Sequence, residues 1–320
     1  MERLNLTDIS NLTEEECRLT FEGIRWPNGV VCPRCSEAVA VVRISGKSAR
    51  PGLYRCNTCN REKRNAQFTV KVGTVMEDSP IRYKTWLMAF CMETSSKKGY
   101  SSHQMARNLG VTQKTAWFLG HRIRHAMETS PNAPLLGGPG GVVEVDETYI
   151  GGKPRTNYWK DIERPWTLKT PVVALVDRAG RVRSMPKDRV TAENLKAAIR
   201  ENVDPDSRIM TDEHQGYVGV GKEFASHETV CHGRKEYVRG DVTTNTVEAY
   251  FALLKRGIHG TFHHLSKTHL HRYCNEFDFR WSHRKASDTS RLIEAIAQSE
   301  GKRLTWAQPS TEVENLVGLV

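Results

Sequence analysis

Two closely spaced cysteine pairs lie near the start of the chain, "CPRC" at residues 32–35 and "CNTC" at residues 56–59. Each Cys-x-x-Cys turn places two thiols on one side of the backbone, and two such turns can complete a tetrahedral four-sulfur site. We therefore expect Cys32, Cys35, Cys56 and Cys59 to bind a structural zinc ion, because a closed four-cysteine site leaves no open position for catalysis. Short apolar segments between and after the pairs favour strands, so the pattern predicts a zinc ribbon over residues 28–78, behind a helical segment at 1–27.

The other cysteines occur singly and are expected to be packing residues; they are Cys17, Cys91, Cys231 and Cys274. The first residues have no long apolar run of the signal-peptide kind, and no segment approaches the roughly 18 apolar residues of a membrane span. These features favour a cytoplasmic protein with no membrane partner. Cysteines are kept reduced in that compartment, which argues against disulfides.

The charge balance favours a polyanionic partner. The chain has 47 Lys and Arg residues against 37 Asp and Glu, a formal net charge of +10. Basic side chains gain affinity for nucleic acids by displacing counterions from phosphates, although a merely soluble basic protein has the same composition.

Residues 79–130 are predicted to form a helix-turn-helix region. Ser102 is expected to cap a helix that Gly110 ends, and Thr112 to cap a second helix whose first turn would face a DNA groove. The predicted DNA-binding residues on this second helix are Gln113, Lys114, Arg122 and Arg124. An ordinary helical hairpin is the alternative, and the neighbouring zinc module and basic charge favour DNA binding. Residues 131–141, rich in Pro and Gly, are predicted to be a linker.

From residue 142 to 285 the pattern alternates between strands and helices. Three predicted strands are followed by a helix that Thr191 is expected to cap, and then by a strand, a weak helical turn at "GVGKEF", a further strand and a long helix that begins at "TNTVEAYF". This is the element order of a ribonuclease-H-like α/β domain with a mixed sheet. Residues 286–320 are left as a C-terminal tail that contains one helix. The predicted fold is therefore multidomain: a zinc ribbon, a helix-turn-helix and an α/β ribonuclease-H-like catalytic domain.

In this arrangement Asp146 on the first strand and Asp212 at the end of the fourth would lie side by side. Glu248 on the later helix is expected to complete the site, and Lys255, two helical turns further on, could hold a phosphate. Three carboxylates suit two Mg²⁺ ions roughly 3.5–4 Å apart, the arrangement used in phosphodiester chemistry.

Each of these acids has a rival interpretation. Asp146 and Asp212 could be ordinary surface acids at strand ends. Glu248 could instead form a capping box with Asn245. Two other acids compete for the third position, Glu144 on the same strand face as Asp146 and Glu276 on a later helix.

Four sequence blocks then carry a family resemblance: "VEVDETYIGGK", "IMTDEHQGY", "TNTVEAYFALLKRGIHGTFHHLSKTHLHRY" and "NEFDFRWSHR". In this order they resemble the ISXO-type insertion-sequence DDE transposases that carry an N-terminal zinc ribbon. The resemblance extends from the first cysteine pair to about residue 284.

The resemblance implies a ribonuclease-H-like core and Mg²⁺- or Mn²⁺-dependent cleavage of DNA at terminal inverted repeats. It also implies joining of the freed 3′-hydroxyl to target DNA without a covalent protein intermediate. Matched by position, the catalytic acids are Asp146, Asp212 and Glu248, and the trailing basic residue is Lys255. Some relatives have Asn at the third position, which keeps Asn245 in consideration. The chain departs from the pattern at Ser282, where relatives often have Asn.

A protein of this kind would act in the cytoplasm on nucleoid DNA, as a homo-oligomer when two element ends are paired. Two other functions fit the same sequence. One is a DNA-binding regulator with an inactive catalytic fold, and the other is a nuclease that cuts without joining.

Overall fold

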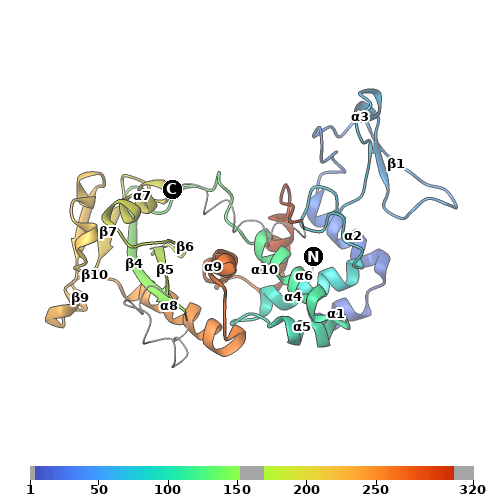
Figure 1. The fold of residues 1–320 in the computed structure, drawn as a ribbon. Helices are drawn as coiled ribbons and strands as arrows, with labels where there is room; N and C mark the ends of the chain where they lie inside the picture. The colour runs from blue at the N-terminus through green and yellow to red at the C-terminus, as the bar shows by residue number, and fades with distance from the viewer. Residues whose placement is uncertain (1–3, 152–168, 306–320) are drawn as a thin grey trace. The chain divides into compact units, whose positions relative to one another are not determined.

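A computed structural model describes residues 4–151 and 169–305 of the chain (Figure 1). The described residues divide into two compact units. The first contains residues 4–128 together with 286–305, and the second contains residues 129–151 and 169–285. Each unit has its own elements and its own core, so they are described separately.

The first unit is built on helices. Its α-helices outside the cysteine module are α1 (Leu6–Asn11), α2 (Glu14–Arg25), α4 (Tyr83–Ser95), α5 (Ser102–Leu109), α6 (Gln113–Ala126) and α10 (Asp288–Ala297). The apolar face of α4 packs against α1, α2, α6 and α10, with Trp86 and Phe90 fully buried. Helix α10, within the predicted tail, is therefore part of this helical core.

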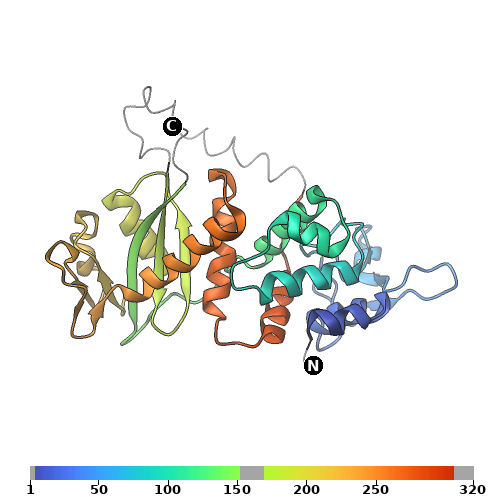
Figure 2. The ribbon, with the colours of Figure 1, turned by 90° about the horizontal axis from the view of Figure 1, so that it is seen from below.

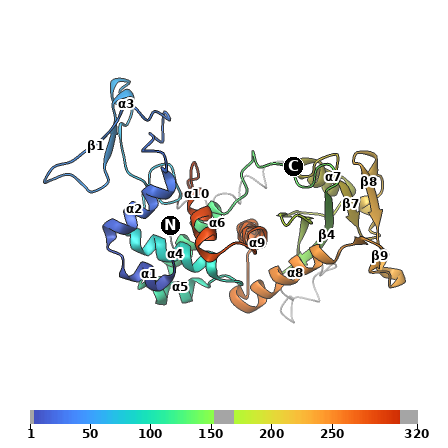
Figure 3. The same cartoon turned by 180° about the vertical axis from the view of Figure 1, so that it is seen from behind.

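The cysteine module forms a three-stranded antiparallel sheet in the order β1-β2-β3. Its elements are β1 (Val41–Arg43), β2 (Tyr54–Cys56), α3 (Asn57–Arg61) and β3 (Gln67–Phe68). The module extends away from the helices of its unit, with the β1 hairpin and α3 at its far end (Figure 3). Its core is small: the rings of Tyr54 and Phe68 stack at 5.8 Å between centroids, and Trp26 packs edge-on against both.

The second unit contains a mixed five-stranded sheet in the order β6-β5-β4-β7-β8. Its strands are β4 (Val142–Ile150), β5 (Thr170–Asp177), β6 (Val182–Pro186), β7 (Arg208–Thr211) and β8 (Ser226–Thr229). Strands β4, β5 and β6 pair antiparallel, whereas β7 lies parallel to both β4 and β8. The interior strand β5 is buried along its whole length, as expected for a strand covered on both faces.

Helices cover both faces of this sheet (Figures 1 and 2). Helix α7 (Ala192–Asn202) packs on the face that carries Val143 and Val145 of β4. Helices α8 (Asn245–Gly257) and α9 (Leu270–Ser282) pack on the opposite face, where β4 presents its even-numbered residues. A π-helical turn, Ile258–Phe262, follows α8 directly.

Several local predictions are confirmed. Gly110 ends α5 at φ 64°, a left-handed conformation that glycine adopts readily. Thr112 caps α6, because its side chain accepts the N–H of Thr115, and Thr191 caps α7 in the same way. Ser102, by contrast, is the first helical residue of α5, and the cap is Ser101, which accepts the N–H of Gln104.

The stretch between β7 and α8 departs most from the prediction. The weak helical turn at "GVGKEF" is a 3₁₀ turn of three residues, Val220–Lys222. A two-stranded hairpin, β9 (Val238–Arg239) with β10 (Val242–Thr243), was not predicted, because its strands are too short for an alternating pattern. The predicted linker also contains a structured residue, Leu136, which is 1% exposed and joined through its backbone to Asn202 and Asp204.

Candidate metal centre and acidic site

The four cysteines form a closed group. Their sulfurs lie within 4.8 Å of one another, with Cys32 and Cys59 at 3.8 Å and Cys35 and Cys56 at 3.6 Å. A Zn–S bond of about 2.3 Å in a tetrahedral site requires sulfurs about 3.8 Å apart, whereas a disulfide requires about 2.05 Å. The arrangement therefore fits a structural zinc ion. This small module has little apolar core of its own to supply the same stability.

The sheet register brings the two predicted aspartates to the same level. Strands β4 and β7 run parallel, and Glu144 is the partner of Met210. Asp146 and Asp212 each lie two residues further along, so Asp146 in the middle of β4 lies level with Asp212, which directly follows β7. The Oδ1 atom of Asp212 accepts the N–H of His214, which fixes the backbone turn after β7.

Asp146 lies in an unusual electrostatic environment. Its pKa is raised to about 7, chiefly by burial and also by the carboxylates of Asp212, Glu147 and Glu248. A hydrogen bond from the N–H of Glu147 at 2.8 Å acts in the opposite direction. A carboxyl with a pKa this high, facing other carboxylates, is a typical feature of functional sites and is relieved by a bound cation.

Glu248 lies in the first turn of α8 with its side chain 47% exposed. The capping box with Asn245 does not form: the N-cap is Thr244, and α8 has no side-chain cap. Instead Oε1 of Glu248 accepts the hydroxyl of Thr244 at 3.1 Å and lies 3.6 Å from Nε2 of His232. The Glu248 carboxylate is therefore not used as a helix cap, and it contributes to the high pKa of Asp146.

Glu144 takes over the role of the missing cap. It is fully buried, and its Oε2 accepts the N–H groups of Thr246 and Val247 at 2.7 and 3.1 Å. Its Oε1 accepts the Thr246 hydroxyl and the Arg178 Nε–H, both at 2.8 Å. Glu144 thus fastens the start of α8 to β4. Because all its bonds are structural, it is not a free ligand at the acidic site.

Glu276 and Ser282 also have structural places. Glu276 is fully buried in an ion pair with Arg280 one turn away on α9. The hydroxyl of Ser282 accepts the N–H of Val182 at 3.3 Å, which ties the end of α9 to β6. Ser282, where the chain departs from the family pattern, therefore makes a contact between helix and sheet.

Lys255 is exposed on α8 and borders a cavity of about 90 Å³. The cavity is also lined by Tyr149 of β4 and by three histidines that follow α8, His259, His263 and His264. This places the predicted phosphate-binding lysine on the same helix as Glu248, beside a group of polar side chains.

The predicted DNA-binding residues of α6 separate into two groups. Gln113 and Lys114 are exposed on its first turn, with the Gln113 amide donating to the Ser102 hydroxyl at 2.9 Å. Arg122 and Arg124 are buried, which corrects their prediction as DNA contacts. Arg122 donates to the Glu77 carbonyl at 2.9 Å, and Arg124 pairs with a buried acid of α4.

Sequence reasoning missed two neighbours of the acidic site. The Tyr217 hydroxyl donates to Glu147 at 2.6 Å, and burial next to these acids raises the pKa of Tyr217 well above its usual range. His232 contacts both Glu248 and Thr244 and lies in the unpredicted stretch before β9. In the sequence, Tyr217 could have been noticed only through the acid Glu147 beside Asp146, and His232 only because it follows Cys231 directly.

Comparison with known proteins identifies the family. A transposase zinc-ribbon domain matches residues 12–62, and an ISXO2-like transposase domain matches residues 138–282. An uncharacterized protein in transposable element ISH50 of Halobacterium salinarum is 30% identical over 270 residues, which is 80% of this chain and 87% of that protein. The chain therefore belongs to the ISXO2-like family of insertion-sequence transposases with a zinc ribbon.

Among solved structures, the Drosophila P element transposase strand transfer complex matches 69% of this chain at 12% identity and a TM-score of 0.25. The match spans 65% of that transposase, just under two thirds of its length. A likeness this weak carries no argument about the fold. Within residues 4–151 and 169–305, none of the helices is both long and apolar enough to cross a membrane.

Proposed function

We propose that this protein is a transposase that cuts and joins DNA at the terminal inverted repeats of its own element, through Asp146, Asp212 and Glu248. The observation that carries the proposal is that Asp146 of β4 lies level with Asp212 after β7, and that the carboxylates of Asp212 and of Glu248 on α8 add to burial in raising the pKa of Asp146. The order β6-β5-β4-β7-β8, with only β7 and β8 parallel to β4, supports assignment of this unit to the ribonuclease-H-like class.

The three acids would hold Mg²⁺ or Mn²⁺, because carboxylate oxygens are the ligands that these hard cations prefer. Within the described residues only the four cysteines already form a closed ligand group, so ion binding would draw the acids together. When bound, the ions would activate the attacking hydroxyl and stabilise the departing oxygen. Glu144 holds α8 against β4, and Lys255 on α8 would hold a phosphate of the bound strand.

The DNA partners in this proposal are the terminal inverted repeats and a target duplex. Gln113 and Lys114, exposed at the start of α6, are the proposed groove-facing residues of a helix-turn-helix formed by α5 and α6. Pairing two ends calls for a homo-oligomer, acting on nucleoid DNA in the cytoplasm.

The test is strand transfer by the purified zinc-bound protein on its end DNA with Mg²⁺. Asp212→Asn should bind the ends and yield neither cut nor joined product. Asp206→Asn is a matched control, because Asp206 is an exposed acid that lies just before β7. It should retain full activity.

Two outcomes would replace the proposal. Cutting without joining by the wild type would indicate a nuclease. End binding without any metal-dependent cutting would favour a DNA-binding regulator with an inactive catalytic fold.

A further inference from the structure

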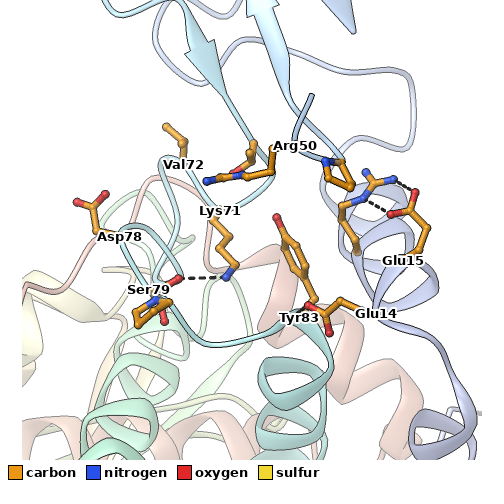
Figure 4. A pocket seen from close by; sticks show the side chains of 12 residues that line it. Glu14, Glu15, Arg50, Lys71, Val72, Asp78, Ser79 and Tyr83 are labelled. Carbon is orange, nitrogen blue, oxygen red and sulfur yellow. Dashed lines mark hydrogen bonds and ion pairs between the residues drawn. The ribbon is translucent and has the colours of Figure 1, made fainter. Parts of the chain in front are cut away.

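A cleft of about 910 Å³ lies within the first unit, between the cysteine module and the helices α2 and α4 (Figure 4). The module contributes Arg50 and Lys71 to its lining, and the start of α4 contributes Tyr83. None of these residues belongs to the zinc site or to the acidic site of the second unit.

The acids that line the cleft are occupied by partners of their own. Both carboxylate oxygens of Glu14 accept N–H groups at the start of α4, from Tyr83 at 2.6 Å and Lys84 at 3.1 Å. Glu15 pairs with Arg18 on the same helix. Asp78 pairs with Arg303. Glu15 and Asp78 are therefore already paired with cations, whereas Glu14 is held by neutral N–H groups.

Two cationic groups in the cleft are not balanced in this way. Arg50 is exposed and makes no hydrogen bond or ion pair with any residue in the described part of the chain. Lys71 is half-buried and donates only to neutral carbonyls, Ser79 at 3.1 Å and Ile81 at 2.5 Å. Its ammonium lies 4.6 Å from the centre of the Tyr83 ring, and Arg50 extends beside both residues (Figure 4).

The surroundings of Lys71 disfavour its charged form. Its pKa is lowered to about 8, chiefly by burial; the charge of Glu14 opposes this effect, and the charges of Arg50 and Arg122 contribute to the lowering. An anion bound beside Lys71 and Arg50 would relieve this repulsion. The cleft thus has unpaired positive charge, an aromatic wall and ample volume for part of a polyanion.

We propose that this cleft binds the sugar-phosphate backbone of DNA, with Arg50 and Lys71 contacting phosphate oxygens. Arginine offers a planar pair of donors that matches a phosphate, and Lys71 has a third N–H beyond the two given to carbonyls. Such contacts position a duplex without reading its sequence. The inference rests on the proposed function, and it makes the zinc ribbon part of the DNA-binding surface.

The first test is fluorescence anisotropy of the zinc-bound full chain on end DNA, titrated at several salt concentrations. Loss of one phosphate contact in Arg50→Ala should weaken binding about five- to tenfold near 0.1 M salt and reduce the logarithmic salt slope by about 0.9. Lys47→Ala is the matched control, because Lys47 is exposed in the same hairpin and lies outside the cleft lining. It should bind as the wild type does.

The second test is acylation of lysines with an amine-reactive ester, followed by mass spectrometry. End DNA should slow the modification of Lys71 several-fold and leave Lys222, in the second unit, less affected. This measurement uses unmutated protein, so it does not depend on how a variant folds.

The outcomes separate the two proposals. If the wild type does not bind end DNA, the proposed function fails and the cleft assignment falls with it. If the wild type binds while Arg50→Ala is normal and Lys71 is not protected, the cleft assignment alone is wrong. Equal weakening by Arg50→Ala and Lys47→Ala would show a diffuse effect of charge and would also overturn it.

Discussion

Replacement of Glu144 by glutamine tests how α8 is held against the sheet. The change keeps the size of the side chain and removes its charge. In the wild type both carboxylate oxygens accept two hydrogen bonds each, from Arg178, the Thr246 hydroxyl and two backbone N–H groups of α8. A glutamine has only one oxygen, so one pair of donors must face an NH₂ group.

The expected cost follows from these contacts. A hydrogen bond to a charged group contributes about 1.5–3 kcal/mol to stability. Removing one partner of a buried pair costs more than this, because the remaining polar group is left buried without a hydrogen bond. Arg178 retains 29% side-chain exposure and can turn toward water, which limits the loss. We therefore expect Glu144→Gln to lower the free energy of unfolding by about 2–4 kcal/mol, or roughly 5–15 °C in the Tm of the second unit.

The assay is thermal unfolding of the full chain without added Mg²⁺. Differential scanning calorimetry is used so that the transitions of the two units can be distinguished. Glu193→Gln is the matched control, since Glu193 is an exposed acid in the first turn of α7. It should change the Tm by only about 1–2 °C. Because Glu248 lies in the same helical turn that Glu144 holds, Glu144→Gln should also require more Mg²⁺ for the same rise in Tm.

A Tm for Glu144→Gln within the range of the Glu193→Gln control would refute this reasoning. It would mean that α8 is held by its apolar face alone, and that the four hydrogen bonds contribute no net stability.

Three further predictions concern other parts of the chain. Cys35→Ser should release the bound zinc, measured by metal analysis, and expose the ribbon to proteolysis while the Tm of the second unit stays unchanged. Burial raises the pKa of Asp278 to about 6 from its usual 3.8, so the folded state holds this proton more tightly. Stability from this group is thus greatest below about pH 4 and declines as the pH rises to about 6, and Asp278→Asn should flatten that decline in Tm measurements. Arg124→Met should cost about 3 kcal/mol by breaking the buried Arg124–Glu93 ion pair, with unchanged DNA affinity. Lys114→Ala should weaken DNA binding without changing the Tm, and the opposite pattern would reverse the assignments on α6.

The parts of the fold that short-range patterns determine could be predicted from the sequence. The two Cys-x-x-Cys turns set the zinc geometry locally, and the helix caps at Thr112 and Thr191 depend on residues three positions away. That the first and fourth strands lie near each other could also be inferred from the element order, and they pair as β4 and β7. This pairing brings Asp146 level with Asp212, which directly follows β7.

Long-range partners account for the errors on α6. Its sequence shows basic residues in the last turns, which is a common feature of both DNA-binding and packed helices. Arg124 is buried because an acid 31 residues earlier, Glu93, lies opposite it on α4. No local pattern shows which surface a basic residue will face once two helices have packed.

The start of α8 shows the same limit and gives the acidic site its physical logic. A local capping box between Asn245 and Glu248 would have bound Glu248 to its own helix. The cap is supplied from β4 instead, by Glu144, more than 100 residues earlier in the chain. Because Glu144 supplies the cap, the Glu248 carboxylate remains available to face Asp146. Burial and the nearby carboxylates raise the pKa of Asp146 to about 7. A fully bonded acid thus stabilises the helix, while the neighbouring acids remain in an arrangement that a bound cation would stabilise, as the proposed function requires.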